Sequence, residues 1–101
     1  MLTKITNMVN SMEDERDDHD QLNVLVDLSY NGLSMKNIRI DHCLIDDRNK
    51  LVIEDTNSID NTIATIDIGL IDSFSEKSVP DGMLYQLHIK DIVFNLLLEN
   101  Q

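Results

Sequence analysis

Apolar side chains near the N-terminus recur at the spacing of an amphipathic helix. The apolar positions of this stretch are Leu2, Ile5, Met8, Val9 and Met12. They predict a helix over residues 1–12 with polar side chains on its other side. Six acidic residues follow within the eight positions 13–20, and runs of like charge tend to remain solvated. We therefore expect an acidic linker over residues 13–21.

The hydrophobic period changes to two after residue 21. Apolar and polar side chains alternate over residues 22–30, which predicts a half-buried strand. Asn31-Gly32 comes next and is a strong signal for a hairpin turn. A two-residue loop would pair Val26 with Asn37 and mix the two faces, whereas a three-residue loop pairs Val26 with Ile38. Because register follows the hydrophobic pattern, we predict the three-residue loop.

Alternating segments continue along the chain. Further strands are predicted over residues 36–46, 51–55 and 62–68. The first of them is expected to carry these residues on its core face: Ile38, Ile40, His42 and Leu44. Residues 72–82 contain Pro80-Asp81-Gly82, a combination typical of turns, and we expect a turn-rich loop there.

The C-terminal segment has two interpretations. A hairpin around Lys90-Asp91 would pair Leu87 with Phe94 and Tyr85 with Leu96. In the alternative, Asp91 begins a closing helix that turns its apolar side chains inward. The hairpin keeps the apolar residues of both strands on consistent faces, and we favour it for that reason.

These elements predict a small single-domain α+β protein covering residues 1–101. The expected order is a helix over residues 1–12, an acidic linker over 13–21 and an antiparallel sheet over 22–98. Turn signals recur every eight to twelve residues, which favours a meander of five or six strands, curled toward a partly open barrel. The N-terminal amphipathic helix would cover one end or one open edge of this sheet.

Charge is the most unusual property of the chain. The 101 residues include 19 acidic and 8 basic side chains, and the formal net charge is −11. The abundance of Ile and Asn indicates an AT-rich genome, which would also favour lysine; yet the chain has 14 Asp and only 5 Lys. The acidity therefore looks selected, and it exceeds the roughly 2–8 charges that solubility requires. It argues against binding nucleic acid or anionic lipid through a basic surface.

Candidate chemistry is sparse. His42 and Cys43 are neighbours on one predicted strand, so their side chains point to opposite faces and cannot form a catalytic pair. We interpret Cys43 as a small buried hydrophobe and His42, near Glu54 on the next strand, as a structural hydrogen-bonding group rather than a general base. The sequence contains no metal-binding motif, phosphate-binding glycine loop or nucleophile elbow. We therefore expect neither an enzyme nor a bound cofactor or metal.

The position of the protein in the cell follows from similar arguments. A single cysteine excludes an internal disulfide framework and fits a reducing compartment. No apolar run approaches the roughly 18 residues of a membrane span, and the N-terminus lacks the pattern of a signal peptide. We expect a cytoplasmic protein that does not bind membranes.

The carboxylates themselves are the best candidates for a binding site. On one sheet face they would repeat at about 5–7 Å, which is close to the spacing of backbone phosphates. Such an array could occupy a groove built for DNA or RNA by binding its Lys and Arg side chains. The candidate partner-binding residues are Glu13, Asp14, Glu15, Asp17, Asp18, Asp20, Asp27, Asp41, Asp46, Asp47, Glu54, Asp55 and Asp67.

In composition the chain resembles the small acidic inhibitors with which phages and mobile elements block restriction or CRISPR enzymes. The resemblance implies a non-enzymatic inhibitor whose partner is a basic protein such as a nuclease, with no direct contact to nucleic acid. One alternative is an interaction or assembly module, such as an immunity protein or adaptor, that associates through its N-terminal helix or a sheet edge. Its partner could be a second copy of the chain, which would give a homodimer. Another alternative is a small enzyme or ligand-binding barrel that uses His42 and Glu54.

Overall fold

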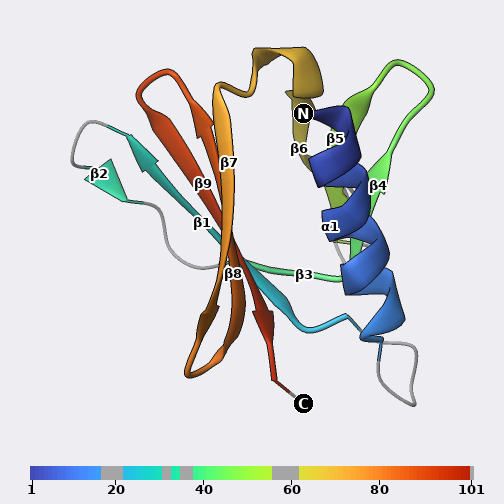
Figure 1. Cartoon of the computed structure of the whole chain (residues 1–101), viewed down its shortest axis with the longest axis vertical. Coiled ribbons are helices and arrows are strands. Elements are labelled where there is room, and N and C mark those ends of the chain that lie inside the picture. The colour runs from blue at the N-terminus through green and yellow to red at the C-terminus, as the bar shows by residue number, and fades with distance from the viewer. Residues whose placement is uncertain (17–21, 31–32, 35–37, 56–61, 101) are drawn as a thin grey trace.

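A computed structural model describes residues 1–16, 22–30, 33–34, 38–55 and 62–100. The chain begins with one α-helix, continues through strands and contains a single 3₁₀ turn in the described part (Figure 1). In order, the elements are α1 (Leu2–Asp14), β1 (Val24–Tyr30), β2 (Leu33–Ser34), β3 (Ile38–Ile40), β4 (His42–Ile45), β5 (Lys50–Glu54), β6 (Thr62–Asp67), η1 (Ile68–Leu70), β7 (Ser73–Val79), β8 (Gly82–Ile89) and β9 (Ile92–Glu99). None of the helices described is long and apolar enough to cross a bilayer.

The strands of the described residues form two antiparallel sheets. Sheet A has the order β2-β1-β9-β8-β7, with β3 pairing on the same strand β1 as β2 does. Sheet B has the order β4-β5-β6. Helix α1 and sheet B lie on one side of sheet A (Figure 1). The α+β class and the N-terminal amphipathic helix are confirmed, whereas the expected single sheet is divided in two and does not close into a barrel.

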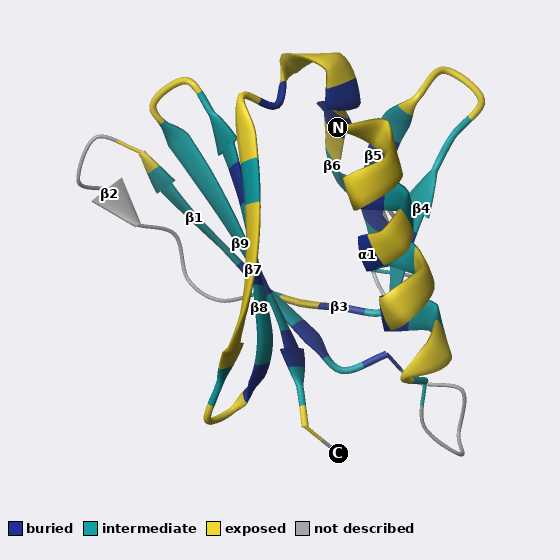
Figure 2. Ribbon diagram, in the orientation of Figure 1, coloured by how far each residue is buried: buried dark blue, intermediate teal, exposed yellow. Residues whose placement is uncertain are grey.

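The hydrophobic core lies between α1 and the facing sides of the two sheets. Helix α1 buries Ile5, Met8 and Met12, which share one face at helical spacing (Figure 2). The sheets bury residues against them in one continuous cluster: Val24, Val26, Leu87, Leu96 and Leu98 from sheet A, and Cys43, Leu51, Ile53 and Ile66 from sheet B. The helix extends to Asp14, two residues into the expected linker. Residues 17–21 of that linker lie outside the described part of the chain.

The first hairpin combines both registers that the sequence allows. Strand β3 pairs Val26 with Ile38, as the three-residue loop predicts. Next to the turn, however, Tyr30 pairs with Leu33, which is the register of a two-residue loop. A tight two-residue turn matches the twist of the flanking strands, while the buried face requires apolar partners for β1. The registers of β2 and β3 on β1 therefore differ by one residue.

The predicted strand over residues 36–46 is broken at Asp41. The bend there ends β3 in sheet A and lets β4 begin in sheet B, with the Asp41 amide donating to the Glu54 carbonyl at 3.2 Å. The bend also changes which side chains face the core. Ile40 and Cys43 are buried, whereas His42 and Leu44 are partly exposed, so the expected core positions of His42 and Leu44 are wrong.

The loop expected over residues 72–82 is also wrong. Residues 73–79 form β7, which pairs with β8 over its whole length, and only Pro80 and Asp81 form the turn. The polar composition of β7 reflects its place at the edge of sheet A, where solvent reaches most of its side chains. The C-terminal hairpin is confirmed, with Leu87 opposite Phe94 and Tyr85 opposite Leu96. Strand β9 also pairs with β1, which a simple meander does not predict.

Candidate functional site

Three acidic residues, Glu13, Asp14 and Glu15, lie at the C-terminal end of α1. The helix dipole favours cations at this end, and carboxylates there typically cost a few tenths of a kcal/mol to about 1 kcal/mol each. The last turn of α1 contains no basic residue that would offset them. The compensating cation is Arg16, which follows the helix directly. Its Nε lies 2.7 Å from Oε2 of Glu13, and its Nη2 lies 3.0 Å from Oε1.

Arg16 also connects the helix end to sheet B. Its Nη2 donates to the carbonyl oxygen of Asp41 at 3.0 Å and lies 3.1 Å from Nδ1 of His42. Because a guanidinium group can only donate, a hydrogen bond in this contact requires Nδ1 to be the unprotonated nitrogen of the ring. The Arg16 side chain is only 16% exposed, compared with 40% for His42. The largely buried guanidinium group of Arg16 therefore connects α1 to the start of β4.

The sheet register brings two more carboxylates to the same place. His42 of β4 pairs with Glu54 at the end of β5, and Asp55 follows directly. The segments that meet here are thus the end of α1, the bend at Asp41 and the end of β5. We call this region the acidic end; its carboxylates belong to Glu13, Asp14, Glu15, Asp41, Glu54 and Asp55. Six of the thirteen candidate residues therefore lie on segments that Arg16 and the sheet register bring together.

The pKa of Glu13 reflects the electrostatics of the acidic end. The hydrogen bond from Arg16 lowers the pKa of the Glu13 carboxyl below its ordinary value, although partial burial opposes the shift. Glu13 is therefore ionised at neutral pH and bound to Arg16. The predicted position of His42 near Glu54 is confirmed by the strand register. The contacts of the His42 ring are with Arg16 and, at 3.8 Å, with Glu13 Oε1.

Other candidate carboxylates have structural roles. Asp46 Oδ1 accepts from the backbone amides of Arg48 and Lys50 at 2.8 and 2.9 Å, and the bond from Lys50 lowers its pKa most. Asp67 Oδ1 accepts from the Gly69 amide at 2.9 Å and caps η1. Both groups stabilise turns of sheet B. Asp47 is exposed in the turn between β4 and β5, and the remaining candidates, Asp17, Asp18 and Asp20, lie outside the described residues.

Asp27 belongs to a row of polar side chains that the sequence did not predict. This row crosses four neighbouring strands on the face of sheet A that points away from α1. Asn95 Nδ2 donates to Asp27 Oδ1 at 2.6 Å, Gln86 Nε2 donates to Asn95 Oδ1 at 2.9 Å, and Ser75 Oγ donates to Gln86 Oε1 at 3.4 Å. The available signal was a polar residue in the middle of the apolar strands β1, β8 and β9. The Asp27 carboxylate therefore accepts a hydrogen bond within the sheet.

Cys43 is expected to be chemically inert in the folded protein. Its side chain is 1% exposed, and burial raises the pKa of the thiol to about 12. Because the thiolate is the reactive form, a chromogenic disulfide reagent at pH 8 should react about 1,000-fold more slowly with the native protein than with the protein in guanidinium chloride. The absorbance of the released thiolate measures both rates. A native rate close to the unfolded one would contradict the buried position of Cys43.

Within the part of the chain that the structure describes, no group of three or more His, Cys, Asp or Glu side chains is arranged to hold a metal ion. The comparisons with known proteins offer no precedent. No protein-family model and no curated protein matches the sequence, and no solved structure matches the fold.

Proposed function

We propose that the protein is a non-enzymatic inhibitor that binds the basic, nucleic-acid-binding surface of a partner protein through its acidic end. The observation that carries the proposal is the position of Glu13, Asp14 and Glu15. They stand where the helix dipole makes carboxylates unfavourable, and Arg16 links this helix end to Asp41 and to His42, which is opposite Glu54 in the next strand. Arg16 offsets the charge of Glu13, and a cationic partner would offset the repulsion that remains among these carboxylates.

Preorganisation of the acidic end supports the same proposal. Arg16 joins the end of α1 to the start of β4 through contacts to Glu13, Asp41 and His42. Carboxylates that are already held in place lose little conformational entropy on binding. Lys and Arg side chains of the partner would exchange phosphate oxygens for carboxylate oxygens, with charge-assisted hydrogen bonds in both cases. Basic restriction or CRISPR nucleases are the partners that we would test first.

The alternative of association through the apolar face of α1 is less well supported. That face carries Ile5, Met8 and Met12, which are 0–1% exposed because they pack in the core of the same chain. Removing the helix would expose this core rather than a binding surface. The sheet-edge alternative is not affected by this argument.

The test begins with proteins that co-purify with the tagged chain at low salt and are identified by mass spectrometry. Binding of a basic nuclease found in this way is then measured at 50 and 300 mM NaCl. We expect its affinity to fall at least tenfold with salt, because the contacts are electrostatic. Affinity that does not change with ionic strength would overturn the proposal.

Paired charge variants locate the surface. The double substitution Asp14→Asn/Glu54→Gln neutralises two carboxylates of the acidic end, and we expect it to weaken binding about tenfold. The control, Asp81→Asn/Asp91→Asn, makes the same change in net charge at two exposed turns of sheet A. It should change the affinity less than twofold. Equal effects of the two doubles would show that net charge, and not the acidic end, determines binding.

A further inference from the structure

Strand β7 leaves one edge of sheet A unpaired within the described residues. Each residue from Ser73 to Val79 pairs with β8, and no described strand pairs with the other side of β7. Exposed edges of this length are commonly protected by bulges, proline or inward-pointing charged side chains. The register of β7 on β8 is continuous, and the charge of β7 that points toward α1 is the Glu76 carboxylate, which a basic residue of an added strand would pair with. The backbone of β7 can therefore accept another strand.

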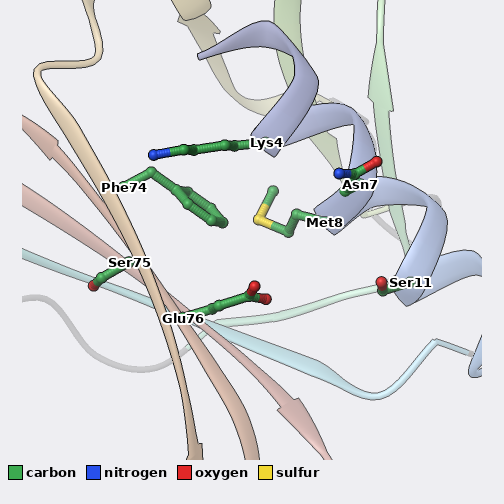
Figure 3. A pocket seen from close by; sticks show the side chains of 7 residues that line it. All are labelled: Lys4, Asn7, Met8, Ser11, Phe74, Ser75 and Glu76. Carbon is green, nitrogen blue, oxygen red and sulfur yellow. The ribbon is translucent and has the colours of Figure 1, made fainter.

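A pocket lies between this edge and α1. It has a volume of about 350 Å³ and is lined by Lys4, Asn7, Met8 and Ser11 from the helix and by Phe74, Ser75 and Glu76 from the strand (Figure 3). Phe74 and Glu76 point into the space between the two elements, where Met8 extends from the helix. The Phe74 ring packs against Tyr85 at a centroid distance of 6.1 Å. The pocket therefore has an apolar wall and a carboxylate.

The two ends of the pocket differ in charge. Lys4 extends over Phe74, whereas Glu76 lies two residues further along β7 (Figure 3). Next to Glu76, Tyr85 forms a hydrogen bond with Ser11. Burial raises the pKa of Tyr85, and the carboxylates of Glu76 and Glu15 raise it further. A cationic side chain is thus favoured beside Glu76 and disfavoured beside Phe74.

The geometry of strand pairing converts this difference into a sequence preference. Alternate side chains of a strand added to β7 would enter the pocket. In the antiparallel orientation of all other pairs in sheet A, the residue opposite Glu76 precedes the residue opposite Phe74 by two positions. A segment with the order basic, any residue, apolar matches the pocket, and the reverse order does not.

A second copy of the chain fits this edge poorly. Each copy carries a net charge of −11. In a symmetric antiparallel pair of two β7 strands, registers centred on Glu76 or Lys77 place like charges opposite each other. Charge complementarity therefore favours a basic partner over a homodimer.

We propose that β7 and α1 bind an extended basic segment of a partner protein as an additional antiparallel strand, with an arginine or lysine opposite Glu76 and a large apolar side chain opposite Phe74. Backbone hydrogen bonds to the edge of β7 would give affinity, and the pocket would give specificity for the side chains of the added strand. None of the residues that line the pocket belongs to the acidic end, and the inference does not depend on the proposed function.

The probe is a synthetic, end-capped peptide, Thr-Val-Thr-Arg-Thr-Leu-Thr-Val-Thr, added to the full chain labelled with ¹⁵N. We expect saturable shifts of the backbone amide signals of β7 and of the α1 residues that line the pocket. The peptide with Arg and Leu exchanged should bind at least fivefold more weakly. Shifts confined to the acidic end, or equal binding of the two peptides, would overturn the proposal.

Two further comparisons test its separate parts. Glu76→Gln should weaken binding of the Arg-Leu peptide at least fivefold, whereas Lys77→Gln on the other face of β7 should leave it within twofold. Two further peptides are each N-methylated at alternate residues, so that each has lost the backbone donors on one side of the extended chain. The peptide methylated on the side that pairs with β7 should lose binding, and the other peptide should still bind. If both methylated peptides bind equally, strand addition is excluded. Asp14→Asn/Glu54→Gln should not affect this peptide, so each proposal can fail without the other.

Discussion

Replacement of Gly82 by alanine is expected to lower the free energy of unfolding by about 3 kcal/mol. Gly82 begins β8 with a φ of +151°, a conformation that L side chains rarely adopt. A Cβ atom there would overlap the backbone carbonyl oxygen of Leu98 in β9. Because the obstacle is backbone and not a flexible side chain, β8 and β9 would have to move apart.

The matched control is Gly69→Ala in η1. A Cβ at Gly69 would approach only the side-chain oxygen Oδ1 of Asp67, at 3.3 Å, and Gly69 is exposed. We expect this substitution to change stability by no more than about 0.5 kcal/mol. Guanidinium chloride denaturation followed by circular dichroism measures both variants. Similar losses in the two would show that β8 and β9 accommodate the added methyl group.

Substitution of Arg16 by methionine should lower the free energy of unfolding by about 2 kcal/mol at pH 7. The Glu13 carboxylate and the Asp41 carbonyl lose the hydrogen bonds that Arg16 donates, and the His42 ring loses its contact with the guanidinium group. The carboxylates at the end of α1 also lose the cation that offsets their repulsion. Partial exposure of Glu13 and His42 keeps the effect below that of a fully buried ion pair.

The pH dependence of this effect has a definite sign. In the folded protein the hydrogen bond from Arg16 lowers the pKa of Glu13, so the carboxyl binds its proton more weakly than in the unfolded chain. Its contribution to stability is present above the unfolded pKa and is lost as the pH falls through the folded pKa. The difference between the wild type and Arg16→Met should therefore be largest at neutral pH and decrease below about pH 4.

Urea denaturation at pH 7 and pH 3 tests the expectation. Arg48→Met is the control, because it removes an exposed cation from the turn of sheet B while Asp46 still receives the backbone amide of residue 48. That control should change stability by less than about 0.5 kcal/mol. If it destabilises the protein as much as Arg16→Met, the effect of Arg16 is one of net charge and not of its contacts.

The predicted strand pairs were correct where short turns connect the strands. Val26 opposite Ile38 and Leu87 opposite Phe94 follow from alternation, because a one-residue slip would turn a whole apolar face to solvent. Alternation cannot show where a strand leaves its sheet. The bend at Asp41 changed the faces of the following residues, and the polar edge strand β7 lacked the apolar signal that predicts a strand.

The candidate site was predictable only in part. The acidic run before residue 21 and the surplus of carboxylates were evident, but their convergence was not, because Arg16 and the Asp41 carbonyl are 25 residues apart in the chain. Asp27, Asp46 and Asp67 resemble the other acids in sequence, yet they accept hydrogen bonds within the fold. The donor to Asp27 is 68 residues away and could not be found from the sequence, whereas the donors to Asp46 and Asp67 are turn amides two to four residues further along the chain.

The amino-acid sequence by itself thus determined the α+β class, the amphipathic helix, the register of β3 and the closing hairpin, because these depend on periodicity and on residues close in the chain. The tertiary structure decided the division into two sheets, the pairing of β1 with β9 and the pocket between α1 and β7. The physical reason is that a period of two identifies the buried face of a strand but not its neighbour. The neighbour depends on how all apolar faces are buried together, and that choice also brought Asp41 and His42 to Arg16 at the end of α1.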